Sequence, residues 1–415
     1  MLPVRIVRLL LPVLCLVALS ALALAGPAPG LQTAAPTGVV VARLVPGHDD
    51  ADLARVTALA DARPTPRVEP ALLANAAAKA RRASASLDAL ARYVQFDHAG
   101  LDRDGLLRVV RRLAADPAVE HAFLEPRAVP AALGFDAFTG ASPDPAAGAD
   151  PGLPTADFTE WQGYMADAPM GIGAWSVWPE PGARGATVKI IDVEGGWLWT
   201  HEDLPAPFAE LGTQIDDLGW RNHGTAVMGE MVGVDNGYGI SGIVPDAVGG
   251  NSSIGDQSVP EALLAAAAQL EAGDLVLIEL HAPGPNANGS GQYGYVPMEW
   301  WQDNFDAIRA LTDMGIIVVE AAGNGEQDLD DPVYLGLFDR SVRDSGAIMV
   351  GATSGSSLTP AWFTNHGARV DLAGWGANVA TCGYGDLQGG AETEWYTLGF
   401  SGTSSASPII TGAVA

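Results

Sequence analysis

Apolar runs alternate with helical stretches from about Trp161 to the end of the chain. The runs that predict strands are residues 186–192, 275–280, 316–321 and 347–351, and the stretches that predict helices are 223–232, 260–272, 303–314 and 404–415. This alternation is typical of an α/β fold with a mostly parallel sheet and helices on both faces. In such sheets, ligands bind where strands end and helices begin.

A second pattern precedes the first one. Strand-like runs at 38–44, 92–96 and 119–126 enclose two helical stretches, 70–83 and 106–114. The order predicts a small α+β module over residues 38–128. Residues 129–158 are rich in Ala, Pro, Gly and Asp and predict a linker, so the larger α/β unit is expected over 160–415.

The first 25 residues predict a secretory signal peptide. Arg5 and Arg8 precede an apolar run from Leu9 to Ala25 that ends in small residues, and this pattern favours export followed by cleavage over an uncleaved membrane anchor. No later segment predicts a membrane span. Cys382 is the only cysteine after residue 25, so no internal disulfide is expected in the mature chain, and Cys382 is interpreted as a core residue.

The net charge of the chain limits the classes of molecule that it is expected to bind. The 415-residue chain has a net charge of −27 and is 48% hydrophobic, which indicates a globular protein. Residues 31–130 carry 13 basic and 12 acidic side chains, whereas 131–415 carry 7 and 37. So acidic a surface repels nucleic acid and anionic lipid, and neither is expected as a partner.

Four polar residues lie at predicted strand ends and helix starts, in the order Asp192, His223, Asn324 and Ser404. A serine hydroxyl becomes a nucleophile when an imidazole takes its proton, and a carboxylate holds that imidazole in place. An amide donor then stabilises the oxyanion. The esterase motif G-x-S-x-G is absent around Ser404, which argues against a lipase.

The chain resembles the subtilisin-like serine peptidases, or subtilases. The resemblance rests on Ile190-Ile191-Asp192, His223-Gly224-Thr225 and Gly402-Thr403-Ser404-Ser405-Ala406-Ser407-Pro408. It implies that Asp192 orients His223, that His223 is the general base and that Ser404 is the nucleophile. Asn324 and the Ser404 N–H would hold the oxyanion, while Gly402 would let the substrate backbone approach closely. The module at 38–128 resembles the inhibitory propeptides of the same family.

The chain departs from the family pattern at two places. Asp192-Val193-Glu194-Gly195 replaces the usual Asp-Ser/Thr-Gly, and Ile278-Glu279-Leu280-His281-Ala282 replaces a Ser-Leu-Gly type of substrate-binding strand. Backbone pairing with an extended peptide survives such changes. Glu279 and Glu320 both lie near strand ends, and we expect them either to flank the substrate pocket and favour a basic residue, or to form a buried structural pair. The candidate substrate-binding residues are Glu279, Leu280, His281, Glu320 and Gly402.

Together these features predict a secreted serine endopeptidase, made as a self-processing precursor whose partners are peptide substrates and its own propeptide. The alternative is a catalytically inactive, subtilase-like binding protein or fragment, because only 11 residues follow Ser404 where the family normally continues. The chemistry needs no cofactor. The acid-rich Asp328-Leu329-Asp330-Asp331 is interpreted as a solvated turn, with structural calcium as the alternative. Substrate preference, cut site and oligomeric state are left open.

Overall fold

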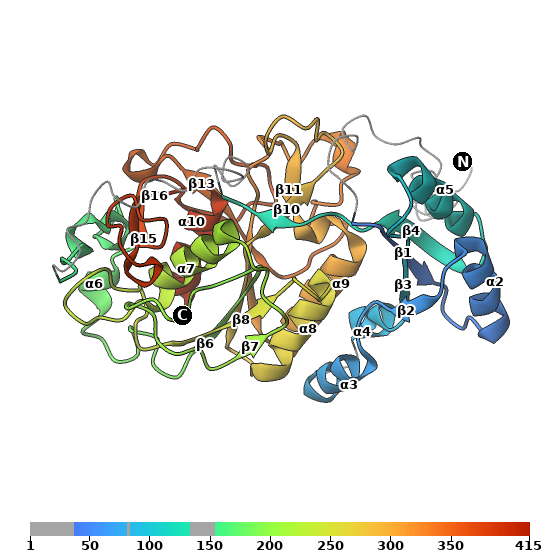
Figure 1. Ribbon diagram of the computed structural model, residues 1–415, viewed down its shortest axis with the longest axis horizontal. Coiled ribbons are helices and arrows are strands. Elements are labelled where there is room, and N and C mark those ends of the chain that lie inside the picture. Colours follow the sequence, from blue (N-terminus) through green and yellow to red (C-terminus); the bar gives the residue numbers. More distant parts are fainter. Residues whose placement is uncertain (1–36, 81–83, 133–153) are drawn as a thin grey trace, which may run out of the picture.

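The computed structural model describes residues 37–80, 84–132 and 154–415, and Figure 1 shows their arrangement. The predicted signal peptide, residues 1–25, lies outside the described residues. In the described part of the chain, no helix combines the length and the apolar character that crossing a membrane requires.

The N-terminal module is a four-stranded antiparallel sheet with helices, in which β2 adds a strand to the three that the sequence predicts. Its strands are β1 (Val39–Leu44), β2 (Pro64–Pro66), β3 (Tyr93–Asp97) and β4 (Val119–Leu124), in the order β2-β3-β1-β4. Two expected helices form, α3 (Pro70–Lys79) and α5 (Arg103–Ala114). Two more were not predicted, α2 (Asp50–Ala60) and α4 (Ala85–Leu90), and the side chains of Asp49 and Ser84 cap them.

The larger unit is built on a seven-stranded sheet, and the prediction of an α/β fold is confirmed. All its strand pairs are parallel, in the order β14-β13-β12-β9-β6-β8-β7. The strands are β6 (Lys189–Glu194), β7 (Glu210–Leu211), β8 (Val248–Ser253), β9 (Leu275–Ile278), β12 (Ile317–Ala321), β13 (Ile348–Thr353) and β14 (Leu372–Trp375). The four predicted strands are therefore β6, β9, β12 and β13.

Helices cover both faces of this sheet. On one face, α7 (Leu218–Val232) and α10 (Thr403–Val414) pack against Ile190, Leu277 and Val319. On the other face, α8 (Val259–Gln269) and α9 (Gln302–Met314) pack against Ile191, Ile278 and Val318. Because alternate residues of a strand point to opposite faces, the parity of a polar strand residue determines which helices it meets.

Shorter elements complete the larger unit. A hairpin joins β15 (Val379–Cys382) and β16 (Tyr396–Phe400), and a second small sheet joins β10 (Leu280–Pro283) and β11 (Tyr295–Pro297). The remaining helical elements are α6 (Ala174–Val177) and the 3₁₀ turns η3 (Thr159–Trp161), η4 (Gly163–Met165), η5 (Met298–Trp300), η6 (Pro332–Tyr334), η7 (Gly355–Ser357) and η8 (Glu392–Glu394).

The start of the predicted linker is part of the fold. Residues Val129–Pro130 form β5, which pairs antiparallel with β10, so the expectation of an unstructured linker from residue 129 is wrong for its first residues. Figure 1 shows this strand leaving the N-terminal module and reaching the larger unit beside β10 and β11. Residues 133–153, the middle of the predicted linker, lie outside the described residues.

The N-terminal module docks on α8 and α9, which lie between it and the seven-stranded sheet (Figure 1). Arg67 pairs with Asp303 at 3.0 Å and Arg43 with Asp306 at 3.1 Å. Lys79 donates to three carbonyl groups at the end of α8, those of Ala267, Ala268 and Leu270. A cation at a helix C-terminus meets the negative end of the helix dipole, so the contact is electrostatic as well as apolar.

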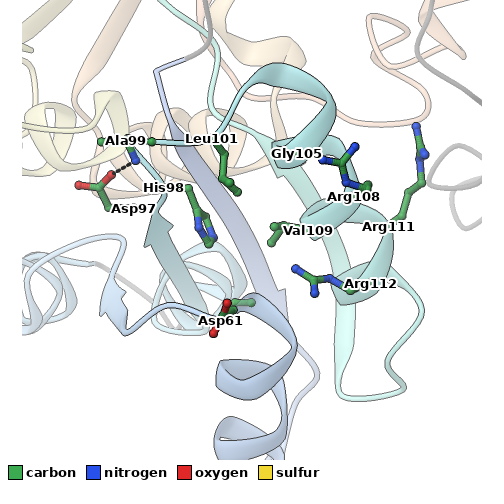
Figure 2. A pocket seen from close by; sticks show the side chains of 12 residues that line it. Asp61, Asp97, His98, Ala99, Leu101, Gly105, Arg108, Val109, Arg111 and Arg112 are labelled. Carbon is green, nitrogen blue, oxygen red and sulfur yellow. Dashed lines mark hydrogen bonds between the residues drawn. The ribbon is translucent and has the colours of Figure 1, made fainter.

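A surface hollow lies in the N-terminal module, lined by residues of α5 and the β3–α5 loop (Figure 2). His98 and Leu101 are on one side, and the guanidinium groups of Arg108 and Arg112 are on the other. None of the predicted site residues lines this hollow, so the candidate chemistry is found elsewhere.

Candidate active site

Ser404 lies in the first turn of α10, directly after the N-cap residue Gly402 and Thr403. Its side chain is fully buried, and its Oγ makes no well-formed hydrogen bond among the described residues, although it lies close enough to Glu279 to lower the pKa of that carboxyl group. Its backbone N–H donates to the carbonyl oxygen of Ala131 at 3.1 Å. The carbonyl group of Ala131, a residue of the same chain, therefore lies at the start of α10, where Ser404 is located.

Residues 129–132 lie across the site as an extended strand. Leu280 pairs with Pro130 and His281 with Val129, and Ala132 forms an antiparallel bridge with Gly402. Two further hydrogen bonds hold the segment. The Ala131 N–H donates to the Glu279 carbonyl at 3.3 Å, and the side-chain Nε2 of Gln292 donates to the Ala132 carbonyl at 3.0 Å. This is how a peptide adds a strand to an open sheet edge.

Gly402 is where this segment comes closest to the nucleophile loop. Its φ is +117°, a backbone conformation that L side chains rarely adopt, and a Cβ at this position would lie 2.3 Å from the Ala131 carbonyl oxygen. Only glycine fits such an approach. The close approach of Ala131 and Ala132 thus requires glycine at position 402, and its role toward a substrate stays a prediction.

His223 is not at the start of its helix, as the sequence pattern suggested. The helix α7 begins at Leu218, because the Asp217 side chain accepts the N–H groups of Gly219 and Trp220. His223 is therefore in its second turn, and its side chain is fully buried. Its ring packs edge-on against Phe400 at 5.5 Å, and its Nε2 has no partner among the described residues.

The carboxylate bonded to His223 is Glu194, which corrects the prediction for Asp192. His223 Nδ1 lies 2.8 Å from Glu194 Oε2, whereas Asp192 Oδ2 accepts the indole N–H of Trp197 at 2.8 Å. The reason is local: β6 extends to Glu194 instead of ending at Asp192. Residues two apart on a strand share a face, so both carboxyl groups point toward α7, and the second one reaches the imidazole.

Burial dominates the electrostatics of this cluster. Desolvation, and next the charge of Glu194, raise the pKa of Asp192 well above its usual range, and burial likewise raises the pKa of Glu194. Burial lowers the pKa of His223 to about 3. At physiological pH the imidazole is therefore neutral, which is the form that can accept a proton.

Asn324 lies beside the start of α10, and its side-chain amide is already hydrogen-bonded to Thr403 and Gln292. Its Oδ1 accepts the N–H and the hydroxyl of Thr403, each at 2.9 Å, and its Nδ2 donates to Gln292 Oε1 at 3.1 Å. The Ala131 carbonyl thus receives the Ser404 N–H, while Asn324 reaches the docked segment through Gln292. The oxyanion role of Asn324 stays a prediction.

His281 is fully buried on β10, next to Asn324. Its Nδ1 accepts the Asn324 N–H at 3.2 Å, which places the ring proton on Nε2, and burial lowers its pKa to about 3. Leu280 is also fully buried. Both contribute backbone to the strand that pairs with β5, and the substrate-binding role of Leu280 and His281 stays a prediction.

Glu279 and Glu320 do not flank one pocket, and the expectation of a paired acidic pocket is wrong. The Glu279 carboxylate accepts the Ser407 hydroxyl of α10, whereas Glu320 Oε1 accepts the Glu299 N–H of η5 at 2.9 Å. The two residues therefore point to opposite faces of the sheet, and both are fully buried. Burial raises the pKa of Glu279 well above its usual range and that of Glu320 to about 8. Their positions suit structural, protonated carboxyl groups.

The carboxylates of the acid-rich turn at 328–331 accept hydrogen bonds from backbone N–H groups. Asp328 accepts the Asp330 N–H, Asp330 accepts the Ala368 N–H and Asp331 accepts the Val333 N–H, at 3.0, 2.9 and 2.8 Å. In the described ranges, no group of three or more His, Cys, Asp or Glu side chains is placed to hold a metal ion. Cys382 is fully buried.

Sequence reasoning missed Glu194, Gln292 and Ala131. Glu194 had a signal, since a second acidic residue two positions after Asp192 must share its face. Gln292 lies in a loop and carries no pattern. Ala131 belongs to an Ala- and Pro-rich stretch that becomes a strand only because β10 offers an edge.

The seven-stranded parallel sheet has helices on both faces, a buried histidine of α7 bonded to a carboxyl group of β6, and a buried serine at the start of α10. These features define a protein with a subtilisin-like fold. The sequence model of the subtilase family matches residues 204–415. That is slightly more than half of the chain, so the chain belongs to the subtilase family. The match begins after β6, and the unusual acidic motif lies outside it.

Relatives and a solved structure agree with this assignment. The chain is 26% identical over 245 residues to an alkaline protease of Alkalihalobacillus alcalophilus, covering 56% of this chain and 54% of that protein. It is 26% identical to Subtilisin Savinase of Lederbergia lenta, covering 56% and 77%. It thus spans about half the length of the alkaline protease. The structure of fervidolysin from Fervidobacterium pennivorans, a keratinolytic enzyme related to subtilisin, matches 93% of this chain and 55% of its own chain, with a TM-score of 0.56 at 16% identity, which shows a shared fold.

Proposed function

We propose that this chain is the precursor of a secreted serine endopeptidase that cuts itself between Ala131 and Ala132. The observation that carries the proposal is the hydrogen bond from the Ser404 N–H to the Ala131 carbonyl. A backbone N–H at a helix start, aimed at a peptide carbonyl next to a buried serine hydroxyl, is the arrangement in which an acyl transfer begins.

We infer the following steps from the chemistry of these groups. Ser404 Oγ attacks the Ala131 carbonyl carbon while its proton passes to His223 Nε2, and the resulting imidazolium is stabilised by the buried carboxylate on Nδ1. The Ser404 N–H stabilises the oxyanion, and Asn324 adds its amide once it exchanges Gln292 for that oxygen. His223 then gives the proton to the departing Ala132 nitrogen. Water hydrolyses the Ala131 ester with His223 again as the base. These steps use only side chains, backbone and water.

The N-terminal module provides the first substrate and then blocks the cleft. It is anchored on α9 by the buried Arg67–Asp303 pair and the part-buried Arg43–Asp306 pair, and on α8 by Lys79. The strand β5 carries the end of the module along β10. Other peptides would bind as β5 does, by backbone pairing with Leu280 and His281, after the module leaves. Ala131 is itself fully buried, so a small residue before the cut bond suits this site.

Secretion rests on the predicted signal at residues 1–25. Alkaline proteases and subtilisins are among the relatives, and one similar protein is an intracellular serine protease of Paenibacillus polymyxa. The location is therefore tested directly: the chain with its signal, expressed in a secreting host, should be recovered from the medium without residues 1–25.

The decisive experiment follows the purified precursor by intact mass. The chain should separate into two fragments whose new ends are Ala131 and Ala132, and Ser404→Ala should stay whole. A fluorophosphonate probe should label Ser404 in the processed protein and fail to label His223→Ala. The competing assignment is a catalytically inactive, subtilase-like binding protein. It predicts no cut and no labelling in the wild type, and that result would refute the peptidase.

A further inference from the structure

Two buried carboxyl groups lie side by side at the end of β6. Asp192 and Glu194 are both fully buried, and successive same-face residues of a strand are about 6.6 Å apart along the backbone. Glu194 has one methylene group more than Asp192, which lets it extend further toward α7 and His223.

The hydrogen bonds of these groups leave one oxygen on each without a donor. Glu194 Oε2 meets His223 Nδ1, and Asp192 Oδ2 accepts the Trp197 N–H. Asp192 Oδ1 and Glu194 Oε1 are buried with no partner among the described donors. The interaction between the two side chains adds to the rise in the pKa of Asp192 and opposes the rise in the pKa of Glu194. A hydrogen bond between them would need a proton on one group, because an ionised carboxylate has none to donate.

The surroundings favour one shared proton. The titratable groups that face the pair are His223 from α7, Glu279 beyond β9 and Tyr384 after β15. None of these groups is a permanent cation. Two adjacent carboxylates in a dry site cannot both be ionised at low cost. Glu194 faces a ring N–H, which favours its charged form, while the neutral form of Asp192 accepts from Trp197 and donates with its other oxygen.

We propose that Glu194 is the positioning carboxylate of His223 and that Asp192 is its neutral partner, which donates a proton to Glu194. This rests on the proposed peptidase function and changes which residue the imidazole depends on. The proton of Ser404 would pass to His223 as before, and the positive charge on the imidazole would be balanced by Glu194. Asp192 would hold Glu194 in place.

Isosteric substitutions separate this arrangement from one in which Asp192 is the carboxylate. In Asp192→Asn, the side-chain oxygen can still accept from Trp197 and the NH₂ group can donate to Glu194, so nothing essential is lost. Glu194→Gln removes the negative charge beside Nδ1. Removing the corresponding charge in a serine-protease triad costs about 10⁴-fold in kcat. Glu230→Gln is the matched control, since Glu230 is also fully buried and its oxygens have no partner among the described residues.

The first measurement is the rate constant of self-cleavage after refolding. Asp192→Asn and Glu230→Gln should process within tenfold of the wild type, and Glu194→Gln should be slower by about 10⁴-fold. A folded Asp192→Asn chain that fails to process, or a Glu194→Gln chain that processes normally, would overturn the assignment.

The second measurement does not depend on activity. In the full chain with Ser404→Ala and ¹⁵N-labelled histidine, the His223 Nδ1 proton should give a far-downfield resonance that persists in Asp192→Asn and disappears in Glu194→Gln. The opposite pattern, or loss in both variants, overturns the proposal. If the wild type neither cuts nor binds the fluorophosphonate, the peptidase function fails, yet this spectrum still decides which carboxyl group holds the imidazole.

Discussion

Arg67 of the N-terminal module and Asp303 of α9 form a buried ion pair, with Nε and Oδ2 3.0 Å apart and side-chain exposures of 2% and 1%. Arg67 also pairs with Glu125 at the end of β4 through its Nη1. One guanidinium group therefore links the module's own sheet to the helix on which the module docks. Both charged side chains are out of contact with water, so removing one of them leaves the charge of the other buried without a partner.

Arg67→Ala should weaken docking strongly. Leaving Asp303 buried without its partner costs about 3 to 5 kcal/mol, to be measured as the change in unfolding free energy of the Ser404→Ala chain in urea. Arg184→Ala is the control, because the ion pairs of Arg184 with Asp235 and Asp246 are partly exposed and should contribute less than about 1 kcal/mol. An equal, small effect of both substitutions would mean that the interface does not depend on its buried pair.

Lys79→Met should speed release of the module after cleavage. The ammonium group donates to three carbonyl groups at the end of α8, at 2.7 to 3.1 Å, and a methionine keeps the apolar stem without the charge. We expect a loss of about 1 to 2 kcal/mol of docking free energy from the helix-end interaction, measured as the increase in the dissociation rate of the cleaved module. Lys79→Arg should retain most of the affinity. Unchanged release in Lys79→Met would show that water replaces these contacts fully.

The sequence predicted the layers of the fold because its central strands are apolar runs between amphipathic helices. It missed β8, since Val248-Gly249-Gly250-Asn251-Ser252-Ser253 has no apolar pattern. The glycine at 250 is needed there because a Cβ would lie 2.9 Å from the Phe208 ring. Such a strand is selected by its neighbours, which local pattern cannot reveal.

The sequence likewise predicted part of the candidate active site. Local motifs identify His223 and Ser404, but only Ser404 lies at the start of its helix, whereas His223 is in the second turn of α7. Which carboxyl group meets His223 does not, because Asp192 and Glu194 share a face and the choice depends on side-chain reach and on the indole of Trp197. The separation of Glu279 from Glu320 could have been deduced only with the strand register, in which Glu320 lies beside Ile278.

Gly402→Ala should block self-cleavage while leaving the fold intact. The added Cβ would lie 2.3 Å from the Ala131 carbonyl oxygen at a φ of +117°, so the carbonyl group must move away from the Ser404 N–H. A displacement of this size at the reacting bond costs on the order of 10²-fold in rate. Gly399→Ala is the matched control, because its Cβ would meet nothing closer than 3.7 Å. Intact mass against time gives both rates, and equal rates would contradict the docked position of Ala131.

Glu230→Gln should stabilise the protein increasingly as pH rises. Glu230 is fully buried on α7, and burial, followed by the charge of Glu279, raises its pKa well above the ordinary 4.5. The folded chain therefore holds this proton where the unfolded chain has lost it, so the wild type loses stability as pH rises above about 4.5. Glutamine cannot ionise, so the free-energy difference between variant and wild type should grow by up to about 1.4 kcal/mol per pH unit. Urea unfolding of both proteins in the Ser404→Ala background, at steps from pH 4 to 8, measures it. Below pH 4.5 the two curves should run parallel, and a constant difference up to pH 8 would mean that Glu230 is ionised in the fold.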